Sequence, residues 1–340
     1  EAGAAPPVAM PFRDIAGHRS LLALLAQSVT RGTTPATLLF AGPAGVGKWR
    51  VAVALAQALN CLERTPEGDA CGRCRSCDRI ARHVHVDVIA LEPDDTGKIK
   101  IEVVRDVLER CQYRPFEGQR RLVLVRDADA LLEAAQNALL KSLEEPPPAT
   151  VFVLTSAAPD ALLRTVRSRT MRLTFGRVPA DDVAAVLVRD HAVEATEARR
   201  LAMLSDGSPG TALALASSDG ADTRDAAADL LRAAGAPDLN ARLAIAKAIV
   251  GEKKSERTRV EMQAVLRAAS SLVRDVAALH AQADPRILAN GDIADVLGRL
   301  ARTLSPEAAR RAFATLDRGQ TALERNAGIK LVAEWVAAEL

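Results

Sequence analysis

The residues best suited to chemistry form one glycine-rich segment, Gly42-Pro43-Ala44-Gly45-Val46-Gly47-Lys48. A short apolar run at residues 37–41 precedes it and a helix-forming run follows it, which is the context that a phosphate-binding loop requires. Its glycines, Gly42, Gly45 and Gly47, allow backbone N–H groups to converge on phosphate oxygens, and the following helix N-terminus adds a partial positive charge. Lys48 would bring a point charge to the terminal phosphates. The alternative is a glycine-rich turn that binds nothing.

Two residues that would bind magnesium are missing from this pattern. An active loop needs Ser or Thr directly after the lysine because the hydroxyl coordinates Mg²⁺, and this chain has Trp49 there. Indole offers an N–H donor and no oxygen. The second contact should be an acidic residue after the apolar run 121–125, but the chain continues with Arg126 and then Asp127. A guanidinium at that place repels a metal cation. ATP binding is therefore doubtful, and neither Mg²⁺ binding nor hydrolysis is expected.

Four cysteines predict a metal site. Cys61, Cys71, Cys74 and Cys77 follow the spacing C-x9-C-x2-C-x2-C in a polar segment. Four thiolates suit a tetrahedral Zn²⁺ ion, and a site whose four positions are all filled by protein is structural rather than catalytic. Four reduced thiols, a redox pair or an iron–sulfur cluster are the alternatives. Cys111 stands apart and is predicted to be a buried core thiol.

Composition bounds the remaining possibilities. The 340 residues suffice for two or three domains, and the net charge of +2 gives no overall attraction for polyanions. Aromatic residues make up 3%, which argues against a platform that stacks single-stranded bases. No apolar run reaches the length of about 18–20 residues that a membrane span needs. The clustered cysteines favour metal binding in a reducing compartment, so we expect a cytoplasmic protein without a membrane partner.

Alternating elements must position these side chains. Short buried-strand patterns occur at residues 37–41, 86–91, 121–125 and 151–155, and helical patterns at 21–28, 51–59, 101–111 and 130–143. Such alternation predicts a mostly parallel sheet covered by helices. After Val178 the strand patterns stop and helical spacing continues to the end. Apolar residues of the last part, such as Leu266, Leu272 and Val276, have the spacing of a helix face, and the sequence does not separate a core from an interface.

These segments together resemble the clamp-loader branch of the AAA+ ATPases and, within it, the delta-prime subunits of bacterial DNA polymerase III. The stretches that carry the resemblance are residues 12–18, the loop at 42–48, the cysteine segment, residues 136–147 and residues 163–170. It covers residues 11 to about 210 and becomes general helical character beyond. The resemblance implies an α/β AAA+ core at 1–177 with a zinc module inserted at 61–77, an all-α lid at 178–235 and an all-α collar for oligomerisation at 236–340.

The resemblance also assigns roles to single residues. Ser168-Arg169-Thr170 matches the family's Ser-Arg-Cys motif, whose arginine reaches the γ-phosphate in the neighbouring subunit, so Arg169 is the candidate arginine finger. Thr155 falls where the family's first sensor residue lies. The second sensor is an arginine in a Gly-Ser-x-Arg segment, and Gly210 stands in its place. This third lost contact favours a delta-prime subunit over the gamma/tau subunits, which hydrolyse ATP.

Three functions are possible for a chain with these features. The first is a non-hydrolysing clamp-loader subunit without independent ATPase activity, which packs with gamma/tau motor subunits and a delta subunit in a five-membered ring and acts through it on the sliding clamp and primer–template DNA. The second is an active DNA-dependent AAA+ ATPase, against which Trp49, Arg126 and Gly210 argue. The third is a DNA-binding module that uses the cysteine segment, whose arginines are offset by nearby acidic residues.

Overall fold

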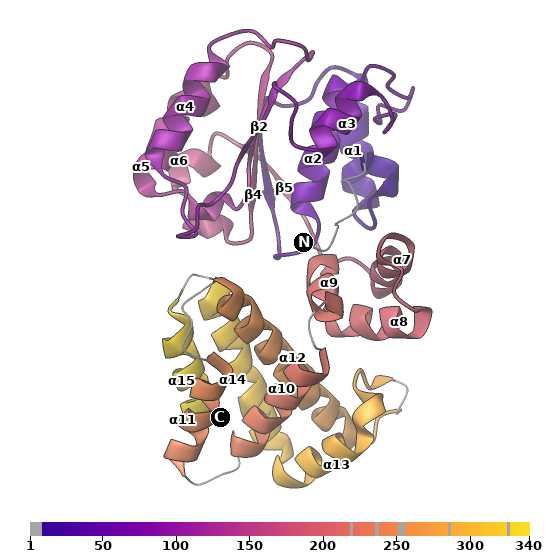
Figure 1. Cartoon of the computed structure of the whole chain (residues 1–340), viewed down its shortest axis with the longest axis vertical. Helices are drawn as coiled ribbons and strands as arrows, with labels where there is room; N and C mark the ends of the chain where they lie inside the picture. The colour runs from indigo at the N-terminus through magenta and orange to yellow at the C-terminus, as the bar shows by residue number, and fades with distance from the viewer. Residues whose placement is uncertain (1–8, 218–219, 235–237, 251–255, 285–286, 325–326) are drawn as a thin grey trace. The chain divides into compact units, whose positions relative to one another are not determined.

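The computed structural model of the chain describes residues 9–217, 220–234, 238–250, 256–284, 287–324 and 327–340. The chain divides into two compact units, one up to Asp182 and one from Val183 onward. The first unit combines a sheet with helices, and the second is helical throughout its described residues (Figure 1). An α/β region followed by a helical region is the organisation that the sequence predicts.

A five-stranded parallel sheet forms the centre of the first unit. Its order is β2-β3-β4-β1-β5, and every neighbouring pair is parallel. The bounds are β1 (Thr37–Ala41), β2 (Val88–Leu91), β3 (Arg121–Val125), β4 (Thr150–Ser156) and β5 (Met171–Thr174). Strands β3 and β4 are buried at every position, which is why they are continuous apolar runs in the sequence.

Helices cover both faces of this sheet, as Figure 1 shows. The short helix η1 (Phe12–Asp14), α1 (Arg19–Thr30) and α2 (Lys48–Asn60) bury their apolar residues against one face. Against the other face pack α4 (Ile101–Cys111), η2 (Ala128–Ala130), α5 (Glu133–Glu144) and α6 (Arg164–Arg167), with η3 (Pro159–Ala161) between β4 and α6. The buried thiol of Cys111 belongs to this second core, as the sequence predicts.

Two elements of the first unit have no clear sequence signal. The edge strand β5 has exposed or half-buried residues at all four positions, so it lacks the apolar run of a central strand. Helix α3 (Arg75–Ala81) is short and polar, and it lies in the cysteine segment between α2 and β2. Both are defined by tertiary neighbours: β5 by pairing with β1, and α3 by packing on α2.

Helices make up the described part of the second unit. They are α7 (Ala180–His191), which begins just before it, α8 (Ala195–Leu204), α9 (Pro209–Ser217), α10 (Gly220–Ala234), α11 (Leu239–Val250), α12 (Glu256–His280), η5 (Gly291–Ile293), α13 (Ala294–Thr303), α14 (Pro306–Glu324) and α15 (Ile329–Glu339). One apolar cluster joins α10 to α15, and Leu266, Leu272 and Val276 of the predicted stripe are buried within it. The predicted boundary between lid and collar, at residues 235 and 236, lies outside the described residues, and the division into lid and collar stays a prediction.

Among the described helices, none combines the length and the apolar character that crossing a membrane requires.

Candidate functional site

The glycine-rich loop lies where a parallel sheet places its ligands. It connects the carboxyl end of β1 to the N-terminus of α2, and the ends of β3 and β4 lie beside it because β4 pairs with both β1 and β3. Gly45 and Gly47 have φ values of 72° and 101°, which side chains rarely adopt. A Cβ on Gly42 would lie 2.3 Å from the carbonyl oxygen of Phe175, so the close approach of the chain after β5 requires glycine there.

The lysine of the loop turns back onto the loop itself. Lys48 Nζ donates hydrogen bonds to the carbonyl oxygens of Gly42 at 2.7 Å and Pro43 at 2.6 Å, and the residue is 6% exposed. His18 Nε2 lies 2.9 Å from the carbonyl oxygen of Val46, which ties the segment before α1 to the same loop. The ammonium group is therefore bound to carbonyl oxygens of its own loop in this structure.

Trp49 and Arg126, which stand where magnesium ligands are expected, contact each other. The guanidinium carbon of Arg126 lies 5.6 Å from the centroid of the Trp49 ring. The imidazole of His83 stacks on the same indole at a centroid distance of 6.2 Å and an interplanar angle of 19°. Arg126 also pairs with Glu92, at 3.7 Å between Nη1 and Oε1. Trp49, which follows the loop, and Arg126, which follows β3, are thus joined by a cation–π contact.

Thr155, the predicted sensor residue, is buried at the end of β4. Its Oγ1 accepts a hydrogen bond from the backbone N–H of Asp127 at 3.1 Å and donates to the carbonyl oxygen of Val125 at 3.4 Å. Asp127 has the left-handed φ of 48°. The Thr155 hydroxyl therefore holds the turn after β3 in place and connects it to β4, the strand beside β1.

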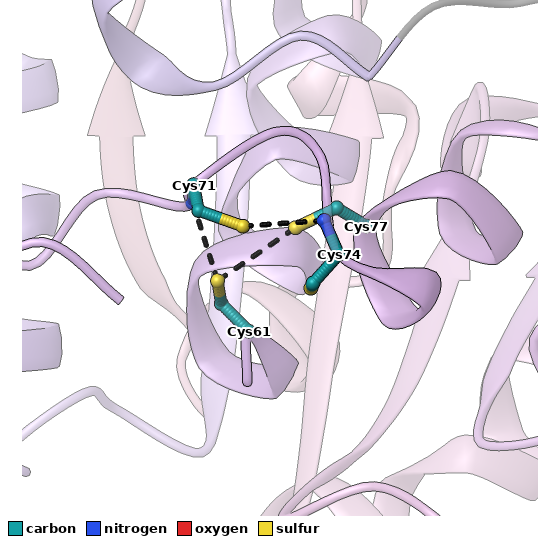
Figure 2. A group of neighbouring side chains, drawn as sticks. All are labelled: Cys61, Cys71, Cys74 and Cys77. Carbon is teal, nitrogen blue, oxygen red and sulfur yellow. Dashed lines mark hydrogen bonds between the residues drawn. The ribbon is translucent and has the colours of Figure 1, made fainter. Parts of the chain in front are cut away.

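The four predicted cysteines come together between the end of α2 and the start of α3. Their sulfur atoms all lie within 4.8 Å of one another, and the sulfurs of Cys61 and Cys77 are 3.8 Å apart (Figure 2). Thiolates around one tetrahedral zinc ion lie about 3.8 Å apart, given Zn–S bonds of about 2.3 Å. The backbone N–H groups of Cys71 and Cys74 donate to the sulfurs of Cys61 and Cys71, at 3.2 and 3.3 Å. The cluster could hold a metal ion and is compatible with zinc.

The chemistry of the thiols agrees with a closed site. Burial raises the pKa of Cys61 and of Cys77 in the absence of a metal ion. Desolvation acts in the same direction on Cys74, but hydrogen bonds from the backbone of Cys77 and Leu62 outweigh it and lower the pKa of this thiol to about 6. A cation bound by all four sulfurs would offset the cost of burying their charges.

A polar clamp fastens the cysteine segment to the start of the chain. The Asp69 carboxylate accepts from the backbone N–H groups of Phe12, Arg13 and Ala70, at 2.8, 3.2 and 2.8 Å. Arg13 pairs with that carboxylate at 3.1 Å and donates to the carbonyl oxygens of Ala70 and Cys71. The module is therefore part of the first unit, not an appendage. Nothing in the residue spacing indicated this clamp.

Arg169 lies at the other end of the sheet from the loop. Its carbonyl oxygen accepts from Thr37 Oγ1 at 2.8 Å, and Thr37 begins β1 whereas Gly42 follows its end. The five residue steps from Thr37 to Gly42 therefore separate the two by about 17 Å. The guanidinium Nε donates to Glu144 Oε2 at 2.9 Å, and the side chain is 33% exposed. Gly210, at the predicted second sensor position, lies in the first turn of α9 in the second unit.

The structure brings the predicted loop residues together at one place and puts the other predicted site residues elsewhere. At the carboxyl ends of β1 and β4 lie the loop residues Gly42, Gly45, Gly47 and Lys48, together with Thr155. The cysteines form their own cluster, and Arg169 lies at the opposite end of the strands, away from both groups. The partners Glu92, His83 and Glu144 were missed because each becomes relevant only through a contact across the fold.

Comparisons with known proteins agree with this fold and loop. Residues 17–179 match the family described as "DNA polymerase III, delta subunit". The chain is 31% identical to the tau subunit of DNA polymerase III from Escherichia coli (strain K12), over 94% of this chain and 52% of that protein. It is 39% identical to the delta' subunit of Pseudomonas aeruginosa, over 51% of this chain and 53% of that protein, and 36% identical to the delta' subunit of Escherichia coli, over 59% and 60%.

Among solved structures, a gamma subunit-related protein of Thermotoga maritima has a TM-score of 0.38 and 16% identity, over 82% of this chain and 99% of that one. The Thermotoga maritima RuvB branch migration motor has a TM-score of 0.41 and 15% identity, over 79% and 78%. Scores this low describe a distant likeness.

The parallel sheet, the glycine-rich loop after β1 and the helices on both faces define an AAA+ type of P-loop core, as predicted. The family match in residues 17–179 and the similarity to delta' subunits support a member of the clamp-loader family of DNA polymerase III subunits. The chain spans about half the length of the tau relatives that it matches.

Proposed function

We propose that this protein is a non-hydrolysing, delta-prime type subunit of a clamp loader. The observation that carries the proposal is the contact between Trp49 and Arg126, at 5.6 Å between ring centroid and guanidinium carbon. Cleavage of ATP in this fold needs a hydroxyl and a carboxylate that hold Mg²⁺. A cation over an aromatic ring supplies neither, so the two usual Mg²⁺ contacts are missing. Lys48 and the loop backbone are compatible with nucleotide binding without turnover.

The protein would act on a neighbour's nucleotide instead. Arg169 lies about one strand length from its own loop, which favours a role outside its own site. A guanidinium is always charged and can contact phosphoryl oxygens as their charge grows in the transition state. In NTPases generally such arginines contribute about 10³–10⁵ in rate. We therefore assign Arg169 as the arginine finger for an adjacent motor subunit.

The assembly follows from the same assignment. The chain would occupy a fixed place in a five-membered cytoplasmic ring with gamma/tau motor subunits and a delta subunit. Its relatives are by name subunits of DNA polymerase III, which supports such an assembly. Through the ring it would take part in placing the sliding clamp on primer–template DNA. The metal at the cysteine cluster would be a structural Zn²⁺ that holds α3 against α2.

ATP hydrolysis by purified components tests the proposal. The chain alone should release no phosphate above the background that Lys48→Ala gives. Addition of a motor subunit with an intact loop should produce turnover that depends on Arg169. Steady phosphate release by the chain alone, abolished in Lys48→Ala, would refute the non-hydrolysing assignment.

An active motor subunit is the second candidate, because tau relatives match across 94% of this chain. That function requires Mg²⁺-dependent hydrolysis by the chain itself, so the same measurement separates the two. A third function, DNA binding by the cysteine module, would instead give salt-dependent binding of duplex DNA to the isolated protein.

A further inference from the structure

The guanidinium of Arg169 is held from one side by its own chain. Its Nε donates to Glu144 Oε2 at 2.9 Å and its Nη1 donates to the carbonyl oxygen of Thr165 at 3.2 Å. Within the described residues Nη2 makes no hydrogen bond or ion pair with the protein and is not buried, so this end of the planar fork is open to solvent. Two inward hydrogen bonds fix both the position and the plane of this group.

The backbone on either side of Arg169 is fixed as well. Its carbonyl oxygen accepts from Thr37 Oγ1 at 2.8 Å, and its N–H donates to the carbonyl oxygen of Val166 at 3.2 Å. Thr170 Oγ1 donates to the carbonyl oxygen of Val166 at 3.2 Å. The Cα position is therefore set by β1 and α6, and the direction of the long side chain is what the two remaining contacts decide.

The position of Glu144 is fixed by the end of α5. It is the last residue of that helix, and Pro146 follows two residues later, where a helix cannot continue. A carboxylate at a helix C-terminus is disfavoured by the helix dipole, so a guanidinium partner at that place is favourable. The neighbouring Glu145 carries the same charge, but it is exposed and its side chain makes no hydrogen bond or ion pair in the described residues.

We propose that Glu144 is a positioning residue for Arg169: it binds Nε so that the Nη2 end of the guanidinium points out of the molecule toward an anionic phosphoryl group of a neighbouring subunit. This inference rests on the proposed function of Arg169. A free arginine samples many rotamers, and each must be given up when the phosphate is bound. A carboxylate that binds the Nε edge of the guanidinium and leaves the Nη2 end open reduces this loss of side-chain entropy. Correct placement matters because a small misplacement of a catalytic group lowers the rate strongly.

The experiment uses the reconstituted complex of this chain with motor subunits that have intact loops. Steady-state ATP turnover is measured against ATP concentration for Glu144→Ala, Glu144→Gln, Arg169→Ala and the double variant, with Glu145→Ala as the matched control. We expect Glu144→Ala to lower kcat at the shared site roughly tenfold, with little change in KM. Glu144→Gln keeps an oxygen that accepts from Nε and should retain most of the rate. Glu145→Ala should behave as the unaltered protein.

The double variant makes the test specific. Once Arg169 is removed, a residue that acts through it has nothing left to position, so the double variant should be no slower than Arg169→Ala. Unchanged turnover in Glu144→Ala, with turnover lost in Arg169→Ala, would overturn the positioning role and leave the finger intact. Faster turnover in Glu144→Ala would show that the carboxylate competes with phosphate and would also overturn it. Unchanged turnover in Arg169→Ala would refute the proposed function itself.

Discussion

The guanidinium carbon of Arg126 lies 5.6 Å from the ring centroid of Trp49, so the residues at two expected magnesium positions form one cation–π pair. Such a pair at a half-exposed site is worth about 0.5–1 kcal/mol. This energy is small, but the contact means that the two substitutions for magnesium ligands, Trp49 and Arg126, lie against each other. Replacing one of them leaves the other in the same space.

Trp49→Thr alone should therefore leave the chain unable to hydrolyse ATP. The substitution supplies the missing hydroxyl, but Arg126 still presents a positive charge toward the metal position, beside Glu92. Phosphate release with and without Mg²⁺ checks this, and the matched variant is Trp49→Thr with Arg126→Asp, which supplies both kinds of oxygen. Robust hydrolysis by the single variant, lost on Lys48→Ala, would contradict the role given to Arg126.

Arg169→Ala should fold normally and depress ATP turnover of the reconstituted complex. The side chain is one-third exposed, and its ion pair with Glu144 contributes at most about 1 kcal/mol to stability. Arg169→Lys should rescue little, because an ammonium cannot use both edges as the planar guanidinium does. Thermal melting and turnover are measured together, with the exposed Arg164→Ala as control. Equal turnover in the Arg164 and Arg169 variants would remove Arg169 from the mechanism.

Cys74→Ser should lower the metal content and the stability of the first unit. The remaining three sulfurs leave one coordination position open, and metal binding contributes directly to folding in such modules. We expect a loss of several kcal/mol, or roughly 10 °C in Tm. Metal content by mass spectrometry and Tm before and after chelation are the measurements. Cys111→Ala, which alters a thiol of the sheet core, should keep its metal; equal metal content in both variants would contradict a four-sulfur site.

Asp87 should stabilise the fold above pH 4 and cease to do so in acid. Its buried carboxylate is desolvated, but hydrogen bonds from the N–H groups of Gly118, Glu117 and Phe116, and from Arg121, outweigh this effect and lower its pKa. A carboxyl group with a lowered pKa in the folded state contributes stability above its unfolded pKa of about 3.9, and this is lost as pH falls through the folded value.

Asp87→Asn tests that account. It leaves the buried guanidinium of Arg121 without its charge partner and should cost about 3–5 kcal/mol at neutral pH. The difference in free energy of unfolding between the variant and the unaltered protein, measured from pH 7 downward, should begin to shrink near pH 4 and be lost as pH falls through the lowered folded pKa. A difference that stayed constant down to pH 2 would show that packing, and not charge, explains the loss.

Much of the first unit could be predicted because its strands are buried on both faces. Strands β1 and β3 and helix α4 have the predicted bounds, since continuous apolar runs and a clear amphipathic face mark them. Strand β5 could not be predicted, because none of its four positions is buried and its backbone hydrogen bonds to β1 are what hold it.

The sequence by itself determined the types of residue at each site: a loop with a lysine but no hydroxyl after it, four cysteines at metal-binding spacing, and an arginine before β5. These follow from local spacing, which a single segment carries. Only the tertiary structure decided that Trp49 meets Arg126, that Asp69 and Arg13 fasten the cysteine module, and that Glu144 holds Arg169. Each pair joins segments that are far apart in the chain, and contacts of that kind depend on how the sheet and its helices pack.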